Sequence, residues 1–197
     1  MSNTLPCTLE VRRLAAVGER ELAELADVLV DCVEGGASVS FMLPMTRAKA
    51  LAFWRKVADG IARGERTLIV AEDEVGIAGT VQLVHDLPEN QPHRADLAKM
   101  LVHRRARRRG AGEALMRAAE AAARALGKTL LVLDTADAGA VRLYARCGWI
   151  ECGTVPRYAL MPDGAPCATT FFYRELASCP GQNPGTGSPS SFARANT

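Results

Sequence analysis

The sequence predicts one α/β domain organised around a mixed β-sheet, and three observations lead to this fold class. The chain has 197 residues, which suffice for one domain with a substantial core and fall short of two. Along the chain, segments in which apolar and polar residues alternate, as in strands, are followed by segments whose apolar residues recur at helical spacing. In the C-terminal half the order is strand, helix, strand, helix, strand, which implies a parallel or crossover connection within the sheet.

The N-terminal half is predicted to hold a strand, two helices and a β-hairpin. Residues 8–14 alternate like a short strand, and residues 19–33 carry apolar side chains at helical spacing. Two glycines end that helix, and residues 34–46 form a loop with apolar side chains before a second helix begins. Two apolar runs within residues 66–84 flank a polar turn, which is typical of a hairpin.

The C-terminal half is predicted to alternate strands and helices. Residues 94–102 alternate as a strand from which Asp96 projects, and the helix that follows is expected to end at Gly127. A buried strand, a short helix and two further strands complete the domain, over residues 128–135, 137–148, 149–155 and 168–176. Residues 177–197 are rich in Gly, Pro and Ser, which predicts a disordered tail behind a folded domain of residues 1–176.

Basic residues are concentrated in one place. The chain has 24 Lys and Arg against 22 Asp and Glu, and five of the arginines lie within residues 104–109. Setting these five aside leaves 19 basic residues, fewer than the acidic ones. A protein that coats nucleic acid usually spreads its basic residues over a face, so this distribution argues against such a protein.

Cysteine usage and hydropathy indicate the compartment. Six cysteines are scattered without a CxxC pair or histidines at metal spacing, which argues against a disulfide scaffold and a metal site. The sequence shows neither a signal-peptide pattern nor a run of about 18 apolar residues. We therefore expect a soluble, cytoplasmic protein with reduced thiols, no metal ion and no membrane partner.

The arginine run lies where a strand meets a helix. Such a turn, with glycines after it and the positive end of the helix dipole behind it, is suited to bind a pyrophosphate through backbone amides. A P-loop is excluded because no Lys-Ser or Lys-Thr pair follows a matching pair of glycines in this turn. The GxGxxG fingerprint is excluded because Leu115 stands where the third glycine is required. A solvated helix entrance remains the alternative on spacing alone.

The hexapeptide from Arg107 to Gly112 fits the pattern (Arg or Gln)-x-x-Gly-x-(Gly or Ala). With its flanks, "LVHRRARRRGAGEALM", and with the later segment "DAGAVRLYARCGW", the chain resembles the GNAT superfamily of N-acetyltransferases over residues 8–176. The resemblance implies a single GNAT-like domain with a splayed central sheet flanked by helices, and acetyl-CoA as cosubstrate. Within the superfamily, "DCVEGGASVSFMLP", "LLVLDT" and "PRYALMPDG" followed by "TTFFY" look most like tabtoxin-resistance acetyltransferases.

The resemblance also implies a cofactor site. The backbone of residues 108–113 is expected to bind the pyrophosphate of coenzyme A. The edge of the preceding strand is expected to bind the pantetheine, with the Met100 amide polarising the thioester carbonyl. Asp137 stands where the family often has an asparagine that contacts the cofactor, and a plain helix N-cap is the alternative. The complete cofactor set is Met100, Leu101, Val102, Arg107, Arg108, Arg109, Gly110, Ala111, Gly112, Glu113 and Asp137.

Tyr144 occupies the place of the family's general acid. A tyrosine, with an ordinary pKa of about 10, is able to protonate a departing thiolate with a pKa near 8.5, although helical spacing alone also fits a core tyrosine. Asp96 and Asp134 are the candidate general bases, because both are expected on elements that flank the splayed strands. Three residues are expected to bind the acceptor: Asp31, Glu34 and Phe41. The open alternative for the two carboxylates is that they are simply solvated, and for Phe41 it is packing of its loop on the core.

Together these features predict an acetyl-CoA-dependent N-acetyltransferase that acetylates a small-molecule amine by direct attack in a ternary complex. The closer resemblance implies an amino-acid-like toxin or antibiotic as acceptor. Two alternatives stay open. One is a nucleic-acid-binding module that uses the arginines of residues 104–109, which lack interleaved aromatic residues for stacking; the other is a non-catalytic acyl-CoA sensor. The alternation of residues 168–176 does not decide whether that strand pairs within the chain or contributes to a homodimer.

Overall fold

The computed structural model describes residues 9–176 and places seven strands in one sheet. The strands are β1 (Glu10–Leu14), β2 (Arg66–Asp73), β3 (Gly76–Val84), β4 (Arg94–Val102), β5 (Leu130–Thr135), β6 (Ile150–Leu160) and β7 (Pro166–Glu175). The helices are α1 (Glu19–Glu34), α2 (Arg47–Ala62), α3 (Ala111–Ala125) and α4 (Ala138–Arg146), with a 3-10 turn at Arg104–Ala106. The strand order across the sheet is β1-β2-β3-β4-β5-β7-β6.

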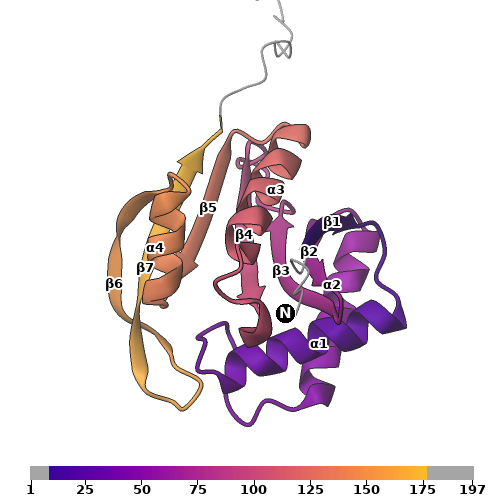
Figure 1. The fold of residues 1–197 in the computed structure, drawn as a ribbon. Coiled ribbons are helices and arrows are strands. Elements are labelled where there is room, and N and C mark those ends of the chain that lie inside the picture. The colour runs from indigo at the N-terminus through magenta and orange to yellow at the C-terminus, as the bar shows by residue number, and fades with distance from the viewer. Residues whose placement is uncertain (1–8, 177–197) are drawn as a thin grey trace, which may run out of the picture.

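The sheet is mixed, as predicted. All neighbouring strands run antiparallel except β4 and β5, which are parallel and joined through α3. These two strands pair over only three residues each, Arg94–Asp96 against residues 130–132, and then diverge (Figure 1). The sheet is therefore splayed at its centre, and the second half of β4 presents its edge to the space between the two halves.

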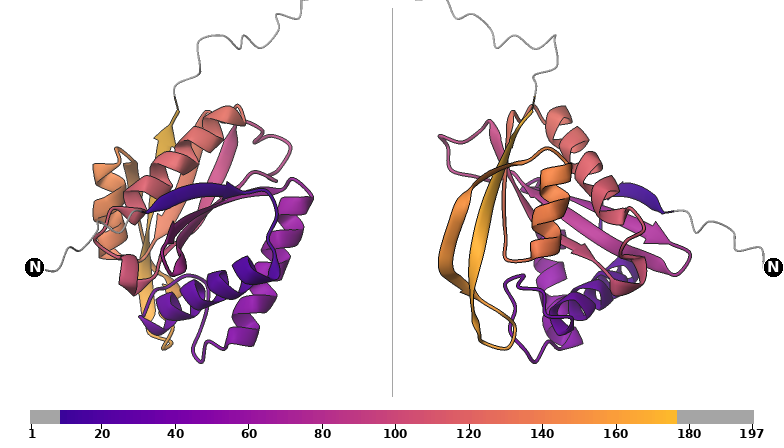
Figure 2. Two further views of the ribbon diagram at one scale, coloured as in Figure 1. Left: turned by 45° about the vertical axis from the view of Figure 1, so that its right-hand side comes forward. Right: turned by 60° about the vertical axis from the view of Figure 1, so that its left-hand side comes forward.

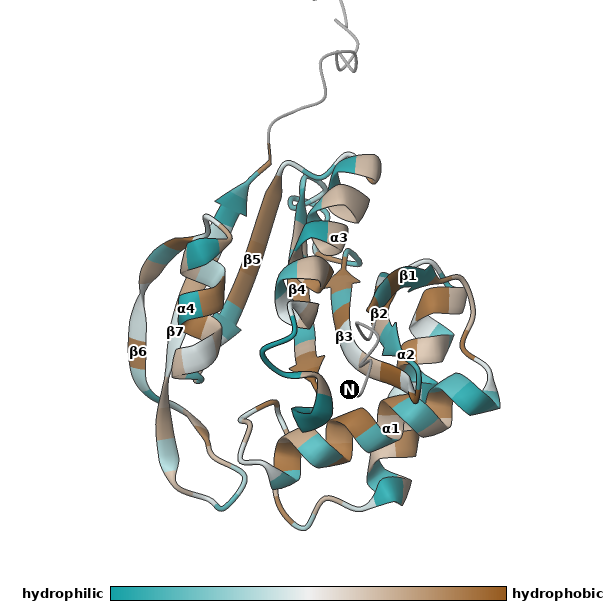
Figure 3. Cartoon of the chain, viewed as in Figure 1, coloured by the Kyte–Doolittle hydropathy of each residue, from teal (hydrophilic) through white to brown (hydrophobic). Residues whose placement is uncertain are grey.

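Helices cover both faces of the sheet. One core cluster packs α3 and α4 against strands from both halves of the sheet, and a second packs α1 and α2 against β1, β2 and β3 on the opposite face (Figure 2). Figure 3 shows the apolar stripe of α1 alternating with its hydrophilic face. Burial of side chains such as Leu115 and Leu29, both fully inaccessible, supplies about 1.5–3 kcal/mol each and fixes the helices that border the splay.

Local signals fix the ends of the helices. At the start of α1 the Glu21 carboxylate accepts a hydrogen bond from the Gly18 amide over 3.2 Å. At the end of α3, Gly127 adopts the left-handed conformation with φ +70°, and the Lys128 amide donates to the Ala123 carbonyl over 2.9 Å. This is the predicted glycine cap.

The β6–β7 hairpin is longer than the sequence indicates. The alternation predicts the end of β6 at residue 155, whereas the strand continues to Leu160. β6 is an edge strand whose residues are almost all exposed, and its register shifts between Val155 and Ala159, so no burial pattern marks its second half. The predicted tail, residues 177–197, lies outside the described residues. Within residues 9–176 no helix is long and apolar enough to cross a membrane.

Candidate active site

A cavity of about 730 Å³ lies at the splay. Its wall combines residues 35–40 after α1, the second half of β4, the turn that opens α3, the end of β5 and one face of α4. These five segments are far apart in the sequence and meet because β4 and β5 separate beyond Asp96. The predicted cofactor set lines this cavity, except Arg109.

A β-bulge in β4 lies against the cavity. Thr80 of β3 pairs with Leu101, and Gln82 pairs with Ala98, so two residues of β4 oppose Val81 alone. Lys99, the first of the two, has a left-handed backbone with φ +49°, and Met100 follows it. A bulge leaves its extra residue outside the ladder and re-aims the backbone. Because β5 has diverged here, the backbone around Met100 is on the open edge of the strand.

The turn before α3 presents backbone amides to the cavity. Arg108 and Gly110 both have left-handed backbones, with φ +60° and +84°. Gly110 is the N-cap of α3, and no side chain caps the helix. The first amides of a helix have no intrahelical partner and lie at the positive end of its dipole. This geometry is that of an anion site, and Arg107 and Arg108 line the cavity beside it.

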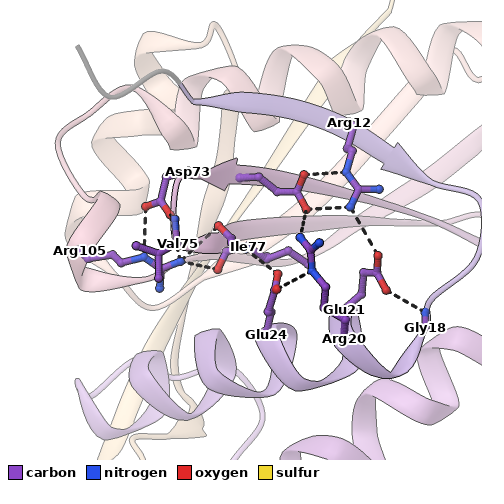
Figure 4. A network of polar contacts seen from close by, with 11 residues as sticks. Arg12, Gly18, Arg20, Glu21, Glu24, Asp73, Val75, Ile77 and Arg105 are labelled. Carbon is purple, nitrogen blue, oxygen red and sulfur yellow. Dashed lines mark hydrogen bonds and ion pairs between the residues drawn. The ribbon is translucent and has the colours of Figure 1, made fainter. Parts of the chain in front are cut away.

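Three of the five arginines in the run are engaged by carboxylates. Arg104 contacts Asp31, while Arg105 donates to Asp73 over 3.1 Å and to the Ile77 carbonyl over 2.8 Å. Arg109 approaches Asp73 to 4.0 Å. Figure 4 shows the Arg105 contacts beside a further network that joins β1, α1 and the β2–β3 hairpin. The hydrophilic segment between β4 and α3 in Figure 3 is thus largely tied to the domain, which does not favour a nucleic-acid-binding face.

Two predicted residues line the cavity at α4, Tyr144 within the helix and Asp137 at its N-cap. Tyr144 is buried, with 4% of its surface exposed, and packs edge-on against Phe172 at 5.7 Å between ring centroids. Burial raises the pKa of the Tyr144 hydroxyl, with a smaller contribution from the charge of Asp137, so the hydroxyl stays protonated at neutral pH. Asp137 is the N-cap of α4, since its carboxylate accepts a hydrogen bond from the Ala140 amide over 2.6 Å.

The two candidate bases occupy different positions. Asp134, at the end of β5, lines the cavity. Asp96 does not; its carboxylate contacts Arg94 at 3.3 Å. Partial desolvation raises the pKa of both carboxyls, and the positive charge of Lys99 opposes this for Asp134. A carboxylate with a raised pKa next to an open cavity is suited to accept a proton from an amine.

The three predicted acceptor-binding residues lie outside the cavity wall. Asp31 is buried beneath the arginine run, where it accepts a hydrogen bond from the Arg104 amide over 2.9 Å. Glu34 is exposed at the end of α1. Phe41 packs edge-on against Phe53 of α2, with ring centroids 5.2 Å apart.

Three charged residues in the cavity wall were not predicted from the sequence. Arg142 and Arg146 of α4 line it, and their spacing of four was visible in the sequence as one helix face. Lys99 also lines it, and its signal was a charged residue within a mostly apolar strand. The bulge that turns Lys99 into the cavity depends on the pairing of β4 with β3, so the sequence of β4 does not indicate it.

A domain with this splayed sheet and an anion site at the entrance to α3 has the architecture of an acyl-CoA-dependent transferase. The model of the acetyltransferase (GNAT) family matches residues 38–149. An uncharacterized N-acetyltransferase of the hisH-hisA intergenic region of Azospirillum brasilense is 32% identical over 129 residues, which are 64% of this chain and 75% of that protein. The chain therefore belongs to the acetyltransferase (GNAT) family.

Solved structures share the fold. The ribosomal-protein-alanine N-acetyltransferase from Brucella melitensis has a TM-score of 0.71 at 22% identity, covering 85% of this chain and 99% of that one. A phosphinothricin acetyltransferase from Sinorhizobium meliloti, in complex with AcCoA, has a TM-score of 0.72 at 19% identity, covering 93% of this chain and 95% of that one. The two names specify different acceptors, so the shared fold does not identify the acceptor of this chain.

Proposed function

We propose that this chain transfers the acetyl group of acetyl-CoA to the amine of a small molecule. The observation that carries the proposal is that one cavity joins the uncapped start of α3, the open edge of β4 at Met100 and the carboxylate of Asp134. The AcCoA complex of the Sinorhizobium meliloti enzyme, which has the same fold, supports acetyl-CoA as the donor.

The donor fits the residues present. The amides from Arg108 to Glu113 would hold the pyrophosphate, and the arginines of the turn and of α4 would neutralise phosphate charge. The β4 edge would hold the pantetheine in an extended conformation. The Met100 amide would donate to the thioester oxygen, where negative charge develops as the tetrahedral intermediate forms.

The chemistry requires two proton movements. Asp134 accepts one proton from the ammonium group of the acceptor, and the neutral amine then attacks the thioester carbon and forms the C–N bond. As the C–S bond breaks, the second proton passes from the attacking nitrogen to the departing sulfur, and the Tyr144 hydroxyl donates a hydrogen bond that stabilises the sulfur as it leaves. The transfer is direct. Cys32, which lines the cavity, is buried; this raises the pKa of its thiol and disfavours the thiolate that an acetyl-cysteine route requires.

The acceptor we propose is an amino-acid-like small molecule, in the manner of a toxin or antibiotic. The similarity to a phosphinothricin acetyltransferase supports this class. A cavity of about 730 Å³ that also contains the end of the donor leaves room for a small acceptor. Asp134 supplies a negative charge that attracts a cationic amine.

Release of free thiol from acetyl-CoA tests this function. The purified chain is incubated with acetyl-CoA and a panel of small primary amines, and the acetylated product is identified by mass spectrometry. We expect amine-dependent release and intersecting initial-rate lines, which are the pattern of a ternary complex. Parallel lines would contradict direct attack. Binding of acetyl-CoA without thiol release for any amine would instead support an acyl-CoA sensor.

A further inference from the structure

Lys99 places an amine cation in the wall of the cavity. Its Nζ donates to the Ser40 hydroxyl over 3.1 Å and lies 5.7 Å from the ring centroid of Phe53 and 6.0 Å from that of Phe41. In the described part of the chain it forms no ion pair within 4.0 Å. A neutral hydroxyl and two ring faces hold the charge in place, and no carboxylate of the described residues lies within ion-pair distance of it.

Two features of Lys99 are unfavourable for folding. Its backbone is left-handed, with φ +49°, a conformation that favours glycine or asparagine over lysine. Burial lowers the pKa of its side chain, and the negative charge of Asp134 opposes that shift only in part. Strained and desolvated residues gather at functional sites, because the surrounding structure holds them there for another purpose.

We propose that Lys99 binds a carboxylate of the acceptor, so that the acceptor is an amino acid or a similar zwitterion. This inference rests on the proposed function. Lys99 of β4 and Asp134 of β5 line the same cavity beyond the point where their strands diverge. A molecule that carries an ammonium group and a carboxylate matches this pair of opposite charges.

The position of Lys99 in the chain links the binding of the acceptor carboxylate to catalysis. Lys99 directly precedes Met100, whose amide is our candidate for polarising the thioester. A carboxylate held by Lys99 would anchor the acceptor beside that carbonyl, so its amine has fewer orientations to search. The other cations of the wall lie on the α3 turn and α4, where the donor phosphates are expected: Arg107, Arg108, Arg142 and Arg146.

Equilibrium binding tests the inference without turnover. The chain is saturated with coenzyme A and titrated by calorimetry with a panel of N-acetyl-L-amino acids and with their matched amides, which lack the negative charge. We expect at least one acid to bind about tenfold or more tightly than its amide, as a charge-assisted hydrogen bond provides. Lys99→Met should remove this ratio, and Lys99→Arg should restore part of it.

Lys49→Met is the matched control. The Lys49 Nζ lies 5.9 Å from the Phe41 ring, but it donates to the Met42 carbonyl and does not line the cavity. This variant should keep the full preference for the acid. The inference is overturned if no acid binds better than its amide to the unsubstituted chain, or if Lys99→Met keeps the preference. If acids bind as expected while no amine releases thiol, the transferase function fails and the role of Lys99 stands.

Discussion

The Asp31 carboxylate of α1 accepts hydrogen bonds from both the backbone amide and the guanidinium group of Arg104, 73 positions later in the chain. The carboxylate is buried, and His103 also lies 3.5 Å from it. These hydrogen bonds hold the end of β4 and the start of the arginine run against α1. They give Asp31 a structural role at the entrance to the anion site.

Asp31→Asn should therefore lower stability and weaken binding of acetyl-CoA. The loss of charge-assisted hydrogen bonds at a buried site costs about 1–3 kcal/mol in the free energy of unfolding. Urea unfolding and calorimetric titration measure the two effects. Asp27→Asn is the control, because Asp27 pairs with Arg47 at an exposed site on the same helix, where ion pairs contribute little. Equal effects of the two substitutions would contradict this role of Asp31.

Gly110→Ala should weaken acetyl-CoA binding about tenfold, because the left-handed N-cap orients the first α3 amides toward the cavity, where we propose that the pyrophosphate binds. Strain at φ +84° costs about 1 kcal/mol or more of stability, while among residues 9–176 no atom beyond the adjacent residues and the helix's own backbone lies within 4 Å of the added Cβ. Gly64→Ala is the matched control, because Gly64 has φ +74° and equally open space around it but does not line the cavity. Both variants should lose similar stability, and only Gly110→Ala should change the Kd.

Tyr144→Phe should lower kcat by about 10²-fold, because the hydrogen bond to the departing sulfur is lost, and leave the Kd for acetyl-CoA nearly unchanged. Tyr173→Phe on β7 is the control, because that residue does not line the cavity. Steady-state rates at saturating acceptor make the comparison. An unaltered kcat in Tyr144→Phe would restrict Tyr144 to its packing against Phe172.

Asp134→Asn should remove the acid limb of the pH–rate profile. The base must be ionised, so the rate of the unsubstituted chain should fall as pH drops through the raised pKa of Asp134. Asp96→Asn should keep that limb, because Asp96 lies outside the cavity wall. The reverse outcome would assign the base to Asp96.

The same carboxyl has a predicted effect on stability. Because its pKa is raised in the folded state, the carboxyl favours folding below its unfolded pKa, and this contribution is lost as pH rises through the folded pKa. Asp134→Asn should therefore unfold at a higher temperature than the unsubstituted chain at neutral pH, and at a similar one in acid. A lower unfolding temperature at neutral pH would show that Asp134 is needed for packing.

The sequence predicts features of this fold that depend on local order. The glycine cap at Gly127, the helix of residues 19–33 and the turn that opens α3 follow from residue types within a few positions of each other. Features that depend on pairing between distant segments escaped prediction. The bulge at Lys99 arises from the register of β3 with β4, and the position of Asp134, but not Asp96, in the cavity wall follows from the point where β4 leaves β5.

The ion-pair partners of the arginine run also depend on distant segments and escaped prediction. The position of the run between a strand and a helix indicated an anion site, and the structure places Arg107 and Arg108 in the cavity wall. Its partners could not be predicted, because Asp31 and Asp73 come from α1 and the end of β2. Neither carboxylate has a spacing that relates it to the run.

The most direct test of the acetyl-CoA site is thermal unfolding of the chain with acetyl-CoA, with ATP and with a short DNA duplex, at low and high salt. A ligand at 100 times its Kd adds about 2.7 kcal/mol and raises the unfolding midpoint by several degrees. We predict a selective rise with acetyl-CoA that persists at high salt and shrinks in Gly110→Ala. A rise only with DNA that salt abolishes would contradict the acetyl-CoA site and assign the arginines to nucleic acid.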